Sequence, residues 1–144
     1  MIMEYLFLFM GDGTTLFLDD VDEEVFLELL NSMHPAIQYT LEKAKRILVG
    51  DTLVQVLVFL SILIFLDEHG NIWTDVYYKP TNTHDYLHYK SHHPEHIKKN
   101  IPHVLAKRIM ILSSKEEAVK KNLADLRLWL RDCGYPEKVI EHGI

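Results

Sequence analysis

The feature that most constrains this chain is an apolar run of fourteen residues, Leu53–Leu66, in the middle of the sequence. A membrane-spanning helix needs roughly 20 apolar residues, so the run is too short to cross a bilayer. It also contains Gln55 and Ser61 and is rich in valine and isoleucine, which favour strands. We therefore predict that the run is a buried β-strand, and we expect no membrane partner.

The residues after this run predict a hairpin. Asp67–Asn71 carries turn residues, and Gly70 within it can adopt a positive φ. The next segment, Ile72–Tyr78, is mostly β-branched or aromatic, and Pro80 then ends the strand because it lacks an N–H donor. The sequence thus predicts a β-hairpin over residues 53–78.

Before the hairpin, the pattern predicts a strand, a helix and a second strand. Tyr5–Met10 is a continuous apolar run, which is typical of a strand buried on both faces. Asp22–Met33 carries apolar residues at helical spacing, and Pro35 stops this helix. Ile37–Ala44 alternates as a strand does, and we interpret Glu42–Arg46 as a solvated turn or strand end.

The C-terminal part predicts three helices. Pro102 suits the first turn of the first helix, and Ser114 with Glu117 forms a capping box that opens the second. Gly134 supplies the left-handed residue that ends the second helix, and Pro136 starts a short last one. Three helices with short joints fit a helix-turn-helix arrangement or a polymerase thumb.

Together these elements predict an α+β fold class, with a small antiparallel sheet and one packed helix followed by a three-helix tail. We expect two regions along the chain. Residues 1–80 would form a partial α/β region that contains the hairpin 53–78, and residues 81–144 would form a connector followed by the helices.

Charge is divided unevenly along the sequence. Residues 1–70 hold 3 Lys/Arg and 12 Asp/Glu, a balance of −9, whereas residues 71–144 hold 12 and 9, a balance of +3. The net charge of −6 argues against an autonomous nucleic-acid binder, which usually has a basic surplus, although the basic half can contact phosphates. Cys133 is the sole cysteine, so no internal disulfide can form, and the apolar start lacks the features of a signal peptide. We expect an intracellular protein of the nucleus or cytoplasm.

Three collinear segments resemble one known family. Thr74–Pro102 reads TDVYYKPTNTHDYLHYKSHHPEHIKKNIP, Leu30–Thr40 reads LNSMHPAIQYT, and Gly134–Ile140 reads GYPEKVI. This order and spacing resembles the reverse transcriptases of Penelope-like retroelements, in which such a segment joins the catalytic palm to a helical thumb often described as a helix-turn-helix domain. The resemblance implies that residues 1–80 are the end of a palm and that residues 81–144 are thumb-like.

The resemblance also implies a set of nucleic-acid contacts. Phe59 and Leu60 align with the primer-grip hairpin, although Ser61 stands where the family usually has aspartate. Basic residues of the connector and first helix would contact backbone phosphates while neighbouring tyrosines stack on sugar or base. Met110 and Ile111 stand where the family tends to have paired arginines, which reduces these contacts. The predicted nucleic-acid-binding residues are Phe59, Leu60, Lys79, Lys90, Lys98, Lys99, Lys107 and Arg108.

Asp19 and Asp20 are similar to the Y-x-D-D turn in which reverse transcriptases hold two divalent metals. Acidic residues followed by apolar residues at helical spacing also suit the start of a helix, which is the interpretation that we favour. The family's catalytic aspartates are then absent, and the chain would start at or just past the catalytic turn. We expect no polymerase activity and no cofactor for this fragment, although the intact family enzyme uses Mg²⁺.

Five histidines recur at spacings of three and four, as in a metal site on one helix face. They are His84, His88, His92, His93 and His96. Two prolines interrupt any continuous helix here, and no cysteine or carboxylate cluster completes a tetrahedron. We therefore predict a structured connector, without metal, in which tyrosines pack and histidines hydrogen-bond.

Three functions stay open. The first is a truncated reverse-transcriptase-like protein of retroelement origin that retains weak binding to a primer–template backbone and whose partners include upstream reverse-transcriptase segments. The alternative is an independent helix-turn-helix module that binds protein or DNA, and the third is a non-functional remnant. The sequence shows no nucleophile elbow, phosphate-binding glycine loop or dinucleotide fingerprint to support a hydrolase or an oxidoreductase.

Overall fold

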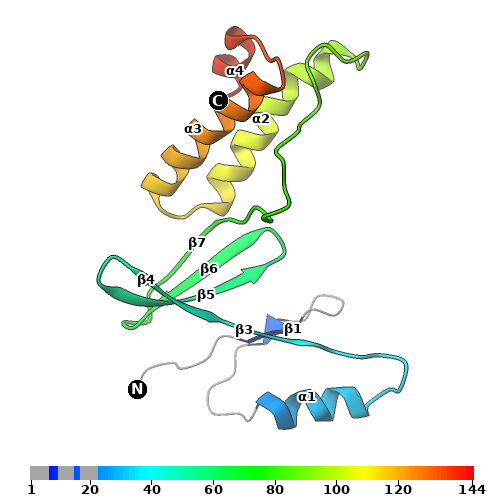
Figure 1. The fold of residues 1–144 in the computed structure, drawn as a ribbon, viewed down its shortest axis with the longest axis vertical. Coiled ribbons are helices and arrows are strands. Elements are labelled where there is room, and N and C mark those ends of the chain that lie inside the picture. The colour runs from blue at the N-terminus through cyan, green and yellow to red at the C-terminus, as the bar shows by residue number, and fades with distance from the viewer. Residues whose placement is uncertain (1–6, 10–14, 17–22) are drawn as a thin grey trace. The chain divides into compact units, whose positions relative to one another are not determined.

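The computed structural model describes residues 7–9, 15–16 and 23–144 and has the predicted α+β fold class (Figure 1). The strands are β1 (Phe7–Phe9), β2 (Thr15–Leu16), β3 (Leu41–Lys43), β4 (Lys45–Val49), β5 (Thr52–Phe59), β6 (Ile62–Asp67) and β7 (Ile72–Val76). The helices are α1 (Glu23–Ser32), α2 (Glu95–Leu112), α3 (Glu116–Asp132) and α4 (Glu137–Gly143). None of the helices in these ranges is long and apolar enough to cross a membrane.

The strands form two sheets, and the chain divides into two compact units. One sheet has the order β2-β1-β3, and the other is a four-stranded antiparallel sheet with the order β4-β5-β6-β7. The first unit holds Met1–Phe59 and Ile64–Ile72, and the second holds Leu60–Leu63 and Trp73–Ile144. We call the second the helical unit. The division into domains 1–80 and 81–144 stays a prediction.

The apolar run Leu53–Leu66 is not one strand, and this prediction was wrong. It folds back on itself as β5 and β6, with Leu60 and Ser61 between them. Leu60 takes a positive φ of 54°, which is uncommon for a residue with a branched side chain. The turn escaped prediction because it contains no glycine, proline, asparagine or aspartate.

The turn between β6 and β7 is the one that the sequence predicts. One carboxylate oxygen of Asp67 accepts the backbone N–H groups of His69 and Asn71, at 2.9 and 2.8 Å. Gly70 has φ 81° and donates its N–H to the Asp67 carbonyl. Because Asn71 also donates from its side chain to Asp67, the pKa of this carboxyl group is lowered.

The segments before this hairpin match the predictions in part. Helix α1 lies within the predicted range, and the described part of Tyr5–Met10 is strand β1. Of the predicted strand Ile37–Ala44, only β3 is regular, and Tyr39 before it is held to α1 by a 2.6 Å bond from its N–H to the Asn31 side chain. Glu42–Arg46 contains the end of β3 and the start of β4, so it is a strand end, one of the two predicted alternatives, and not a turn.

The core of the helical unit is formed by α2, α3, α4 and β7. Its most buried side chains are Ile109, Leu126, Leu130 and Ile140, each at most 1% exposed. Gly134 has φ 77°, and its N–H donates to the Arg131 carbonyl, so it ends α3 as predicted.

The first helix of this unit begins earlier than predicted. It starts at Glu95, after Pro94, so Pro102 lies inside it rather than in its first turn. Pro102 is fully buried, and a Cβ added to Gly143 of α4 would lie 2.6 Å from the Pro102 Cβ. This close approach between α2 and α4 explains how an interior proline is accommodated in a packed helix.

The predicted capping box at Ser114 is also wrong. Helix α3 has Lys115 as its N-cap, without a side-chain capping bond. The Ser114 hydroxyl instead accepts the N–H of Thr74 in β7 at 2.6 Å, and the Ser114 N–H donates to the Thr74 carbonyl at 2.9 Å. A long-range contact therefore replaces the local cap.

The neighbouring residues extend this contact. One carboxylate oxygen of Asp75 accepts the Ser113 hydroxyl at 2.7 Å and the amide of buried Asn122 at 2.6 Å. The Lys115 ammonium lies 3.6 Å from the centre of the Trp73 ring, at cation–π distance. Three consecutive residues of β7 thus meet three consecutive residues of the α2–α3 turn.

We predict that Asp75→Ala lowers the free energy of unfolding by about 2–4 kcal/mol, because the Ser113 hydroxyl loses its acceptor and the buried Asn122 amide keeps only its 3.2 Å bond to the Ser113 hydroxyl oxygen. Urea unfolding followed by circular dichroism at 222 nm measures this loss. Asp75→Asn is the control, since it keeps a side-chain oxygen at the same place and should cost clearly less. Equal losses in the two variants would contradict the role given to this oxygen.

Candidate nucleic-acid interface

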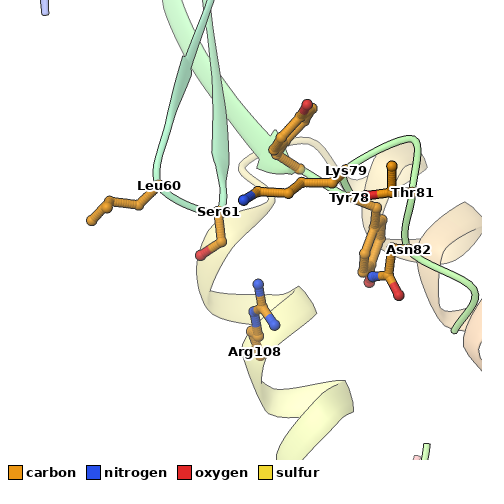
Figure 2. A pocket seen from close by; sticks show the side chains of 8 residues that line it. Leu60, Ser61, Tyr78, Lys79, Thr81, Asn82 and Arg108 are labelled. Carbon is orange, nitrogen blue, oxygen red and sulfur yellow. The ribbon is translucent and has the colours of Figure 1, made fainter. Parts of the chain in front are cut away.

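A cavity of about 320 Å³ lies within the helical unit, between the β5–β6 turn, the end of β7 and helix α2 (Figure 2). Figure 2 shows the Lys79 side chain extending toward Ser61 and the Arg108 guanidinium pointing from α2 into the same space. The residues that line the cavity are Leu60, Ser61, Tyr77, Tyr78, Lys79, Thr81, Asn82 and Arg108.

Backbone hydrogen bonds hold the walls of this cavity. The Tyr77 N–H donates to the Ser61 carbonyl at 2.9 Å, which fixes the hairpin tip to the end of β7. The Asn82 N–H donates to the Lys79 carbonyl at 2.8 Å, and the Asn82 side chain accepts the N–H of His84 at 3.0 Å. The loop that carries Lys79 is therefore an ordered turn.

The charge in the cavity is positive and uncompensated. In the part of the chain that the structure describes, neither Lys79 nor Arg108 has a carboxylate within ion-pair distance. Some other cations of the helical unit are paired with carboxylates, as Lys99 is with Glu95 at 2.8 Å and Lys120 with Glu116 at 2.7 Å. Two unpaired cations beside serine and threonine hydroxyls and an asparagine amide provide the donors that a phosphate group requires.

The cavity brings together three of the eight predicted nucleic-acid-binding residues, Leu60, Lys79 and Arg108. Sequence reasoning missed Ser61, Thr81 and Asn82 as a group of polar lining residues, because nothing in their local pattern indicates that they converge. Asp19 and Asp20, the predicted low-priority catalytic pair, lie outside the described residues.

The other five predicted residues lie elsewhere. Phe59 packs with Leu57 in the first unit, and Lys98 is buried, with its ammonium donating to the Ser91 carbonyl at 2.9 Å. Lys99 is exposed and paired with Glu95. Lys90 and Lys107 are exposed and do not line the cavity.

An aromatic cluster forms the wall behind the cavity. The Tyr78 ring packs edge-on against Trp129 at 5.2 Å and against His84 at 4.8 Å, and His84 stacks on Trp129 at 3.6 Å. Burial, together with a smaller contribution from the nearby Tyr86, raises the pKa of Tyr78 to about 12. The Tyr78 hydroxyl is therefore neutral at physiological pH.

The connector histidines pack and hydrogen-bond. His88 lies against Gly134, where an added Cβ would come within 2.9 Å of the His88 ring, and its Nδ1 accepts the Lys90 N–H at 3.2 Å. His93 shares a hydrogen bond with Ser91 at 3.2 Å. Within the described ranges, no three histidine, cysteine or acidic residues lie close enough together to hold a metal ion.

We predict a steeper loss of stability at high pH in the wild-type chain than in Tyr78→Phe. The pKa of Tyr78 is near 10 in the unfolded chain and about 12 in the fold, so the neutral form is favoured by folding. This contribution is fully present below pH 10 and is lost as the pH rises toward 12. Urea unfolding at pH 9 and pH 11.5 measures it, and an equal loss in both proteins would contradict the assignment.

We also predict that Gly134→Ala lowers the free energy of unfolding by about 2–4 kcal/mol, because it combines left-handed strain with a clash against His88. His88→Ala removes the clash but not the strain. When it is added to His88→Ala, Gly134→Ala should therefore lower the free energy of unfolding only by the backbone strain, about 1–2 kcal/mol. Strict additivity of the two substitutions in urea unfolding would show that the two residues do not meet.

Comparison with known proteins identifies part of the chain. Residues 85–144, which contain the end of the connector and α2, α3 and α4, match the family model described as the animal helix-turn-helix domain. No curated protein and no solved structure matches the chain. Nothing in these comparisons links the chain to a reverse transcriptase or a Penelope-like element. Residues 85–144 are therefore similar to the animal helix-turn-helix domain, and they follow a β-sheet region in the chain.

Proposed function

We propose that this chain is a helix-turn-helix interaction module that binds nucleic acid through its backbone. The observation that carries the proposal is the convergence of Lys79 and Arg108, both without a carboxylate partner in the described ranges, on one cavity lined by hydroxyl and amide groups. Phosphate oxygens accept the hydrogen bonds that these groups donate, and a backbone phosphate is the feature that all nucleic acids share.

The distribution of charge supports binding at this place rather than over the whole surface. The chain has a net charge of −6, so general attraction of nucleic acid is not expected. The residues after 70 carry a surplus of +3, and the helix-turn-helix domain lies among them. Two cations in a preformed cavity therefore account for local recognition of phosphate by a protein that is acidic overall.

We predict that the 144-residue chain binds a labelled RNA–DNA hybrid, and that the logarithm of the affinity falls linearly with the logarithm of the salt concentration. Two neutralised phosphates give a slope of about −1.8 in a plot of log affinity against log salt concentration. The variant Lys79→Ala/Arg108→Ala should weaken binding and bring the slope close to zero, because both phosphate contacts are lost. Fluorescence anisotropy at several salt concentrations measures both.

The matched control changes two lysines of the second helix of the helix-turn-helix domain. Lys120 and Lys121 are exposed on α3 and lie outside the cavity. Lys120→Ala/Lys121→Ala removes the same amount of charge and should leave the slope nearly unchanged. If this variant loses binding and the cavity variant does not, the interface lies on α3 and the proposed site is wrong.

A second candidate function is binding of a protein segment, and an apolar groove beside α2 favours it. The groove has a volume of about 400 Å³ and is lined by Tyr86, Leu87, His96, Ile97, Asn100, Ile101, Val104 and Leu105. Ile97 is 42% exposed and Val104 53% exposed, and both line the same groove, so they form part of one apolar patch of the kind that binds partners. Val104→Asp would abolish capture of a protein partner while leaving nucleic-acid affinity unchanged.

The resemblance of residues 30–140 to Penelope-like reverse transcriptases supports a more specific proposal about origin. The chain would be a retroelement-derived fragment that keeps backbone binding and has no polymerase activity by itself. Primer extension with the 144-residue chain tests this. Extension that depends on Asp19 and Asp20 would contradict it, whereas binding without extension is the expected result.

A further inference from the structure

Strand β4 is an open edge of the four-stranded sheet. The sheet order places it at one end, and its register pairs Ile47 with Val54 and Leu48 with Leu53 of β5. All five side chains of β4 are exposed, although three of them are aliphatic. Leu48 is 73% exposed and Ile47 and Val49 are 41% and 45% exposed. An exposed apolar edge strand is a template for pairing with another strand.

The opposite edge of the same sheet is closed. In β7, both backbone groups of Thr74 are bound by Ser114, whose hydroxyl accepts the N–H and whose N–H donates to the carbonyl. The α2–α3 turn therefore covers β7 in the way that folds protect an edge. The described part of the chain gives β4 no equivalent cover, since its one strand neighbour is β5.

We propose that β4 is a self-association surface, on which β4 of a second copy pairs antiparallel about a two-fold axis through Ile47. A two-fold axis perpendicular to the sheet leaves each side chain on the same face of the sheet. Directly opposed residues also share a face, whereas neighbouring residues of one strand do not. The axis must therefore pass beside a residue that is paired with its own copy, and not between two residues. An axis at Ile47 pairs all five residues of the strand. It sets Lys45 against Val49 and Arg46 against Leu48 of the other copy.

The cations and the aliphatic residues of β4 are arranged so that two copies of the strand complement each other in this register. The two cations lie at one end of the strand and the aliphatic residues at the other. Antiparallel pairing about Ile47 sets each cation beside an aliphatic residue of the second copy, where its methylene stem can cover that residue. Pairing about Arg46, or parallel pairing in register, would set like charges directly opposite each other, which is unfavourable.

This interface lies on a different element from the cationic cavity, so it is independent of the proposed nucleic-acid binding. A dimer formed in this way would join two four-stranded sheets into one sheet. It would also place two helix-turn-helix domains in one particle.

Cysteine cross-linking of the full chain tests the register. Directly opposed residues of an antiparallel pair have Cα atoms about 4.5–5.5 Å apart, within disulfide range, so Ile47→Cys should give a covalent dimer on oxidation with copper phenanthroline. Leu48→Cys alone should not, because its copies are offset along the strand, whereas a mixture of Arg46→Cys and Leu48→Cys should give a heterodimer. The wild-type chain, in which Cys133 is buried, is the background control.

A charge exchange tests the interface in solution. Leu48→Lys changes a side chain that is 73% exposed, so it should not affect folding, but it sets a lysine opposite Arg46 in both halves of the dimer. Sedimentation should show dimerisation weakened about tenfold. The double variant Arg46→Glu/Leu48→Lys sets opposite charges across the interface and should restore dimerisation. A dimer of even weak affinity would be populated at a concentration of about 0.1 mM. The proposal would be overturned if the folded wild-type chain stayed monomeric up to that concentration. It would also be overturned if Leu48→Cys formed the cross-link and Ile47→Cys did not.

Discussion

The helical unit depends on the contact between strand β7 and the turn that joins α2 to α3. Asp75 supplies the acceptor for Ser113 and for the buried amide of Asn122, while Thr74 exchanges backbone bonds with Ser114. A buried amide without an acceptor would cost about 1–3 kcal/mol, so strand and helices hold each other in one arrangement. This explains why Trp73 and the residues after it belong to the same compact unit as the helices, although β7 also belongs to a sheet.

The cationic cavity follows from that contact. Because β7 is fixed to the helical hairpin, the loop that leaves it must pass over α2, and this brings Lys79 to the same cavity as Arg108. Ile109, the next residue along α2, is 1% exposed and anchors this turn of the helix in the core. Neither cation could be placed by its own local sequence. Their proximity is a product of tertiary packing, and the animal helix-turn-helix match, which begins at residue 85, does not include Lys79.

The sequence predicts those parts of the fold that local chemistry decides. Gly134 ends α3 because a left-handed residue is needed there. Predictions failed where a long-range contact overrode a local signal: Ser114 bonds to β7 instead of capping α3, and Pro102 packs against α4 instead of opening α2. The turn at Leu60 and Ser61 contains no glycine, proline, asparagine or aspartate. In the site, a count of basic residues cannot tell an exposed cation from Lys98, which is buried and bonded to a carbonyl group.

In the part of the chain that the structure describes, two residues other than glycine have a positive φ, and they differ in how they are packed. His84 has φ 58°, and its ring stacks on Trp129 and meets Tyr78 edge-on, so packing offsets the strain of its backbone. Leu60 has φ 54° but is 69% exposed, so burial gives it no such compensation. A glycine would adopt this conformation without the cost of about 1–2 kcal/mol that a side chain adds. Strain without internal compensation is typical of residues that contact a ligand, and Leu60 lies at the rim of the cavity formed by Lys79 and Arg108.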